Sequence, residues 1–175
     1  SDRESEPLAL QFMAMGCHAF ILDYSVAPNH FPTSVRELGE AVAYIREHAA
    51  EWKVDPAKII VCGSSAAGHL ACSLGVFWDN ELVYDAIGRT PAQIRPDGLI
   101  LCYPVITGGE YAHVNSFKRL LGDDVTQEQR DAVSLENFVT EQTPRAFIWH
   151  TYTDENVPVE NSLLLAAAMK RKNVN

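Results

Sequence analysis

The stretch that decides the fold is Cys62-Gly63-Ser64-Ser65-Ala66-Ala67-Gly68. The run before it, 58–61, is apolar and β-branched, which predicts a buried strand. The run after it, 69–78, is apolar almost all round, which predicts a buried helix. We therefore expect a tight turn between a strand and a helix, with a serine at the turn.

The turn nearly matches G-x-S-x-G, the nucleophile elbow, with Ala67 in place of the second glycine. An elbow would hold Ser65 in a strained turn at positive φ, so that its hydroxyl projects above the sheet. Small residues at 63 and 67 would let the helix pass close over the strand. The backbone N–H of Ala66 would then point from the helix N-terminus at a developing oxyanion. The alternative is a Gly/Ser/Ala-rich turn that binds a phosphate or no ligand at all.

Length and charge limit the classes of protein to consider. The 175 residues correspond to a single domain, 1–175, which is long enough to bury a sizeable core. The net charge of −9 argues against nucleic acid or an anionic membrane as a partner. No apolar run approaches the ~18 residues that a membrane span needs.

The pattern of cysteines indicates the redox state of the cellular compartment. They form no C-x-x-C pair and fall in or beside apolar segments, at Cys17, Cys62, Cys72 and Cys102. We interpret them as buried free thiols, which favours a reducing, cytoplasmic compartment.

Strand and helix patterns alternate along the chain. Strands are predicted at 17–24, 58–61, 97–106 and 145–150, and helices at 5–15, 33–52, 69–78, 126–139 and 158–172. The alternation predicts an α/β fold with a largely parallel sheet. The long excursion 107–143 is of a kind that roofs substrate sites, and a solvated surface helix is the alternative.

Ligands of such sheets bind at the carboxyl ends of the strands. Ser65 would lie there, and so would the loop 153–158 after the last predicted strand. A serine followed by an acid, here Asp154, is the hydrolase order Ser…Asp/Glu…His. Taken alone, Asp154 would be interpreted as a turn or helix-capping aspartate.

Three motifs in this order resemble the α/β-hydrolase superfamily, near the small-ester esterases related to acetyl-xylan esterases and hormone-sensitive lipase. The segment 23–28 resembles their D-Y-R-L-A-P, 63–71 resembles their G-x-S-A-G-G-H-L-A elbow, and 150–158 resembles their H-x-x-x-D-x-x-V-P acid loop. The resemblance covers nearly the whole chain.

The resemblance implies a three-layer core with a mostly parallel sheet. It also implies Ser65 as nucleophile, Asp154 as triad acid and the Ala66 N–H as an oxyanion donor, with no cofactor and no metal. The substrate would be a small-molecule ester, acetylated sugars included.

Two parts of the family pattern are absent from this sequence. The family's H-G-G-G oxyanion loop precedes the first helix, and its catalytic histidine follows the terminal helix. We therefore expect the central part of a longer protein, without the N-terminal strands and the C-terminal strand and helix, in which the catalytic histidine is not in this chain. His69 and His150 are interpreted as structural, or as supports for the catalytic residues.

The sequence thus favours a serine ester hydrolase, a carboxylesterase or acetyl esterase for short acyl esters that forms an acyl-enzyme on Ser65. A serine peptidase of the prolyl-oligopeptidase kind and a catalytically dead hydrolase-fold binding protein are the alternatives. In the family, a strand that this sequence lacks lies between the strands at 19–24 and 58–61, so these two should not pair with each other. The latter should pair in parallel with 99–102, and 99–102 with 146–149.

Overall fold

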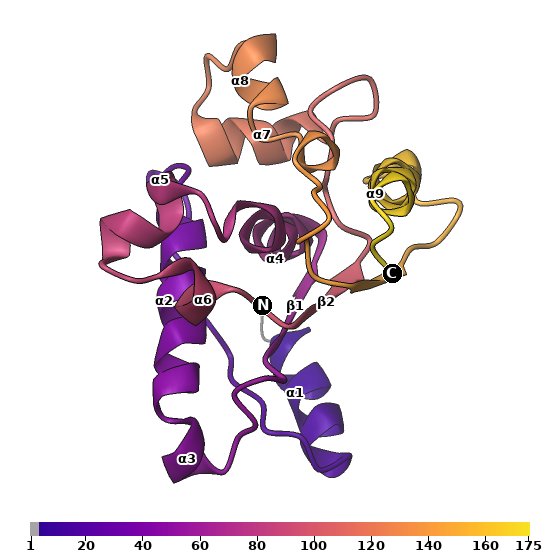
Figure 1. Ribbon diagram of the computed structural model, residues 1–175. Coiled ribbons are helices and arrows are strands. Elements are labelled where there is room, and N and C mark those ends of the chain that lie inside the picture. The colour runs from indigo at the N-terminus through magenta and orange to yellow at the C-terminus, as the bar shows by residue number, and fades with distance from the viewer. Residues whose placement is uncertain (1–3) are drawn as a thin grey trace.

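The structure is a computed structural model, and it describes residues 4–175. A small sheet lies between helices, with α7 and α8 set together at one end (Figure 1). In chain order the elements are α1 (Ser5–Ala14), α2 (Thr33–Glu47), α3 (Ala49–Trp52), β1 (Ile60–Ser64), α4 (Ser65–Phe77), α5 (Glu81–Tyr84), the 3₁₀ helix η1 (Asp85–Ile87), α6 (Pro91–Ile94), β2 (Gly98–Cys102), α7 (Val114–Leu121), α8 (Gln127–Asp131), the 3₁₀ helix η2 (Leu135–Asn137), β3 (Ala146–Trp149) and α9 (Glu160–Arg171).

The strands form one parallel sheet in the order β1-β2-β3. Val61 lies opposite Leu99, and Leu99 lies opposite Ala146. The predicted pairing of the three strands is therefore confirmed. Because the strands are parallel, the segments that follow them emerge at the same edge of the sheet.

The strand predicted at 17–24 is wrong as a sheet strand. Residues 17–26 have no regular secondary structure and form no ladder with β1, although Leu22 and Tyr24 pack against the core. The expectation that this segment would not pair with the elbow strand is confirmed. A short, mostly apolar run predicts extended backbone, but a strand also needs a neighbour to receive its hydrogen bonds.

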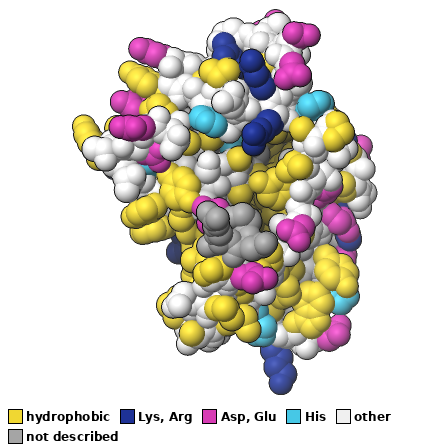
Figure 2. All heavy atoms as spheres, turned by 180° about the vertical axis from the view of Figure 1, so that it is seen from behind, with side chains coloured by type: hydrophobic (Ala, Val, Ile, Leu, Met, Phe, Trp, Pro, Cys, Tyr) yellow, Lys and Arg dark blue, Asp and Glu magenta, His cyan; other side chains and the backbone are white. Residues whose placement is uncertain are grey.

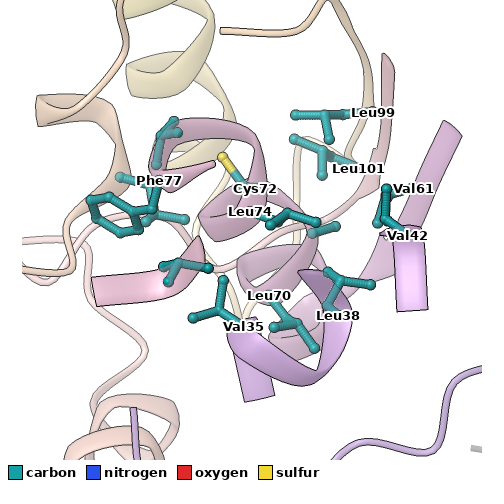
Figure 3. Close-up of a cluster of buried hydrophobic side chains, with 14 of the residues drawn as sticks. Val35, Leu38, Val42, Val61, Leu70, Cys72, Leu74, Phe77, Leu99 and Leu101 are labelled. Carbon is teal, nitrogen blue, oxygen red and sulfur yellow. The ribbon is translucent and has the colours of Figure 1, made fainter. Parts of the chain in front are cut away.

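The core fills the space between the sheet and the helices α2 and α4. Figure 3 shows the side chains of these two helices directed at one another and at the strand residues Val61, Leu99 and Leu101. Helix α4 is buried from Gly68 to Phe77, as its apolar sequence predicts. Leu74, near its middle, has no exposed surface.

The opposite face of the sheet is much less covered by residues 4–175. Cys62, Ile100 and Phe147 form one cross-strand row on this face, and Phe147 is 63% exposed. Helix α1 has no buried residue within the described chain, and a hydrogen bond from Tyr103 Oη to Glu4 fixes its start. Hydrophobic side chains are widespread on the side seen in Figure 2.

The same exposure corrects the interpretation of the cysteines. All four are free, but only Cys72 is buried, whereas Cys62 and Cys17 are exposed and Cys102 is half-buried. Cys62 was expected to be buried, yet it lies on the open face of the sheet. The burial of thiols therefore does not support the cytoplasmic expectation.

The excursion 107–143 differs most from the prediction. The helix predicted at 126–139 ends at Asp131, and η2 follows separately, while the helix α7 was not predicted. The buried Ser134 explains the break, because its hydroxyl accepts a hydrogen bond from the Gly108 N–H at 2.8 Å and donates one to the Arg130 carbonyl at 2.9 Å. That side chain ties the end of α8 to the start of the excursion.

Asn161 joins three segments near the start of α9. Its side chain is fully buried, and its oxygen accepts from the backbone N–H groups of Ile106 and Thr107 at 2.8 and 3.0 Å. Its nitrogen donates to the carbonyls of Tyr111 and Pro158 at 2.9 and 3.0 Å. All four bonding positions of the amide are used. Asn161 therefore connects the segment after β2 to the helix after β3.

Replacing Asn161 by leucine should lower the free energy of unfolding by about 3–5 kcal/mol, because two buried N–H groups would lose their acceptor. Denaturant unfolding of the full-length protein measures this. Asn156→Ala is the matched control, since Asn156 is exposed in the neighbouring loop and should change stability by less than about 0.5 kcal/mol. Equal losses of stability in the two variants would contradict the role of Asn161 in connecting these segments.

Candidate active site

Ser65 lies at the junction of β1 and α4. The strand ends at Ser64, and Ser65 is the first residue of the helix, with φ of 53°. The positive φ predicted for an elbow serine is confirmed. Ser64, by contrast, has an extended backbone and lies opposite Cys102 in the sheet. Of the two serines, only Ser65 has the strained backbone that an exposed turn requires.

Two glycines allow the close approach of α4 to the sheet. A Cβ atom on Gly63 would lie 2.1 Å from the Ala67 carbonyl oxygen, and one on Gly68 would lie 2.8 Å from Pro104 Cβ. Both distances are far below ordinary contact, so neither position tolerates a side chain. Ala67 supplies the carbonyl that approaches Gly63 and keeps its own methyl group. The structure therefore requires glycine at 63 and 68, and accepts the alanine at 67.

The first turn of α4 offers backbone donors beside Ser65. Helix N-termini carry N–H groups without an intrahelical acceptor, and the side chain of Ser64 makes no capping hydrogen bond to them. Ala66 is exposed in this turn. The Ser65 carbonyl accepts a hydrogen bond from the Val105 N–H at 3.1 Å, which ties the elbow to the segment after β2. The site can thus favour negative charge next to the serine.

Asp154 lies in the loop between β3 and α9, which leaves the same edge of the sheet. Its Oδ1 accepts from the backbone N–H groups of Asn156 and Val157, both at 2.9 Å. These bonds, that of Val157 first, hold the pKa of the carboxyl below its usual value. Oδ2 accepts no hydrogen bond within residues 4–175, which leaves it able to accept one from an imidazole.

A cavity of about 470 Å³ opens beside Ala66. Its lining includes His69 and Leu70 of α4 together with Phe117 and Leu120 of α7. The helix α7, which was not predicted, therefore forms part of the cavity wall. The signal in the sequence is the spacing of Phe117, Leu120 and Leu121, which places apolar residues on one helix face.

His69 has a structural place in this wall. Its Nε2 lies 3.0 Å from the Val133 carbonyl, and its Nδ1 lies 3.2 Å from Ser73 Oγ. Complete burial lowers the pKa of the ring to about 4, so the imidazole is neutral and donates from Nε2. The side chain connects α4 to the excursion, in line with the structural interpretation of His69.

None of the six histidines hydrogen-bonds Ser65 Oγ or Asp154 within residues 4–175. His150 approaches Asp154 most closely, with Nε2 3.6 Å from Oδ2, which is longer than a hydrogen bond. The described residues also contain no group of three or more His, Cys, Asp or Glu side chains placed to hold a metal ion. In the same part of the chain, no helix combines the length and apolarity of a membrane span.

Sequence comparison finds one matching family model and relatives that are named as a xylanase and as esterases. The BD-FAE family model matches residues 2–169. Endo-1,4-β-xylanase B of Butyrivibrio fibrisolvens is 39% identical over 98% of this chain, and acetylxylan esterase of Xylanibacter ruminicola is 26% identical over 89% of it. The matched regions are 27% and 31% of those two proteins, so the chain corresponds to about a third of each or less.

Solved structures agree on the fold. The acetyl ester-xyloside bifunctional hydrolase from Caldicellulosiruptor lactoaceticus superposes with a TM-score of 0.90 and 39% identity, over 99% of this chain and 64% of that one. An α/β-hydrolase enzyme from a Medee basin deep-sea metagenome library superposes with a TM-score of 0.71 and 29% identity, over 100% of this chain and 59% of that one. The expected α/β-hydrolase fold is confirmed.

Gly63→Ala should destabilise the folded protein by about 3 kcal/mol or more, because the new methyl group would meet the Ala67 carbonyl and force α4 away from β1. Thermal and denaturant unfolding of the full-length protein measure the loss.

Gly39→Ala is the matched control. Gly39 is buried in α2, where a Cβ atom would make ordinary contacts at 3.5 Å with Ile87. Alanine is the better helix former, so stability should stay the same or rise by up to about 1 kcal/mol. If Gly63→Ala left the stability unchanged, the elbow would not depend on the close approach of α4 to β1.

Proposed function

The chain belongs to the BD-FAE family, and we propose that it carries the nucleophile and the acid of a serine carboxylic ester hydrolase. The observation that carries the proposal is the elbow, in which Ser65 has φ of 53° between β1 and α4. This geometry raises a hydroxyl above the sheet at a helix N-terminus, which is the arrangement that nucleophilic attack on a carbonyl needs. The loop that carries Asp154 leaves the sheet at the same edge as Ser65.

In the proposed reaction, Ser65 Oγ attacks the ester carbonyl while a histidine takes its proton. The Ala66 N–H and the positive end of the α4 dipole stabilise the oxyanion of the tetrahedral intermediate. The alcohol leaves with that proton, and water then releases the acid from the acyl-enzyme. Asp154 is ionised because its pKa is held low, and it orients the imidazole and stabilises its charged form.

We propose that this histidine is not one of the six in the chain. Ser65 and Asp154 have no hydrogen bond to any of them in the described residues, and His69 and His150 already use both ring nitrogens. A further imidazole has to reach the space between the two loops, so Ser65 and Asp154 are not expected to touch.

The substrate class follows from the cavity and from the relatives. The cavity beside Ala66 is mostly apolar, with Asn29, His30 and Arg119 among its polar lining residues, so it offers contacts for a short acyl group and for a hydroxylated alcohol. Two similar proteins are named acetylxylan esterase and acetyl ester-xyloside bifunctional hydrolase. We propose short acyl esters, acetylated sugars included, as substrates. The net charge of −9 disfavours nucleic acid as a partner.

A fluorophosphonate should label the full-length protein on Ser65, and peptide mapping by mass spectrometry locates the adduct. Ser65→Ala should abolish labelling and nearly all hydrolysis of p-nitrophenyl acetate, because the members of a triad act as a unit.

Ser64→Ala is the matched control, since Ser64 is the neighbouring hydroxyl on a strand backbone. It should retain labelling and most of the activity. An adduct on Ser64, or full activity of Ser65→Ala, would remove Ser65 as nucleophile.

Asp154→Asn should preserve the fold and reduce kcat by up to ~10⁴-fold, since the amide does not stabilise the imidazolium that forms during attack. Steady-state hydrolysis of p-nitrophenyl acetate and circular dichroism measure the two effects. Glu155→Gln changes the adjacent, exposed carboxylate and should leave kcat within a few-fold of its original value. A reversal of the two effects would make Glu155 the acid.

A further inference from the structure

His150 and Asp154 are held by the same residue of the acid loop. Asp154 Oδ1 accepts the backbone N–H of Val157 at 2.9 Å, while the carbonyl of Val157 lies 2.8 Å from His150 Nε2. Val157 itself is buried in a small apolar cluster with Val105 and Phe117. Asp154 is therefore bound to the N–H, and His150 to the carbonyl, of one buried residue.

The hydrogen bonds determine the tautomer of His150. A carbonyl only accepts, so Nε2 carries the proton that Val157 receives. Nδ1 then accepts from the hydroxyl of Ser162, which lies 2.7 Å away on α9. The side chain of His150 is only 3% exposed, and both of its nitrogens are satisfied in the neutral form.

These contacts close the acid loop at both ends. His150 is the first residue after β3, while Val157 and Ser162 belong to the end of the loop and to α9. The imidazole thus spans the two ends of the loop from which Asp154 projects. Nε2 also lies 3.6 Å from Asp154 Oδ2.

We propose that His150 is a positioning residue for Asp154. It fixes the acid loop so that Oδ1 stays bound to the backbone while Oδ2 faces the imidazole that activates Ser65. This inference rests on the proposed serine hydrolase function. His150 acts only through Asp154, so its removal matters for the chemical step and loses its effect once Asp154 is already disabled.

The test measures kcat and KM for p-nitrophenyl acetate, and the rate of fluorophosphonate labelling, in the full-length protein. His150→Leu should lower kcat and the labelling rate by about 10- to 100-fold, because a displaced catalytic group loses up to about 10²-fold. KM should stay within about twofold. His150→Gln, which keeps an N–H donor for Val157, should recover most of the lost rate.

The double variant His150→Leu/Asp154→Asn separates positioning from general damage. Groups that act as one unit give non-additive losses. The double variant should therefore label no more slowly than Asp154→Asn alone. Losses that multiply in the double variant, or a His150→Leu protein with the original kcat, would overturn the proposal.

Thr143→Val is the control for loss of a buried polar contact in the segment before β3. Thr143 is buried just before β3, at the end opposite His150, and its hydroxyl accepts from the Thr140 N–H at 2.9 Å. This variant should keep the original kcat, and a loss equal to that of His150→Leu would overturn the positioning role.

If His150→Leu does not fold, Ser162→Ala takes its place. It removes the donor to Nδ1 and should give a smaller fall in kcat that again disappears in the Asp154→Asn background. An unchanged kcat, or a loss that persists in that background, would overturn the inference. Asp154→Asn with full activity would instead refute the proposed function itself, so the two failures are distinguishable.

Discussion

The close contact between α4 and the sheet is the constraint on which the rest of the site depends. The Ala67 carbonyl occupies the space where any side chain at position 63 would begin, and Pro104 occupies the equivalent space at position 68. A helix that starts this close to its strand has no room for a gradual loop. The chain must turn within one residue, which places Ser65 at positive φ and its hydroxyl at the N-terminus of a long buried helix. Packing and chemistry have the same cause here.

The elements that the sequence predicts well are those whose signal is local. The apolar run of α4, the three- and four-residue spacing of α2 and the β-branched runs of the sheet all predict the right kind of element. Segment 17–24 also has an apolar local pattern. A β-strand, however, forms only where a second strand pairs with its backbone N–H and C=O groups. The break after α8 depends on Ser134 bonding across the excursion to Gly108, a contact that no local pattern contains.

The candidate site divides in the same way. Residue type and order make Ser65 and Asp154 the candidates, and a parallel sheet brings the ends of the strands before them to one edge. The partners that hold Asp154 are mainly backbone groups of Asn156 and Val157. Backbone donors exist at every residue, so nothing in the sequence distinguishes these two. The place of Val157 becomes visible only when its N–H is seen to bind Asp154 and its carbonyl to bind His150.

The contrast between His69 and His150 shows how burial and bonding assign roles that residue type alone does not. Both rings are buried and bonded at both nitrogens, and both donate from Nε2 to a carbonyl. The acceptor for His69 is Val133 in the roof of the cavity, whereas that for His150 is Val157, which also binds Asp154. The first histidine therefore shapes the space that a substrate would enter. The second binds the carbonyl of the residue whose N–H binds Asp154, so a change at His150 reaches that carboxylate through Val157.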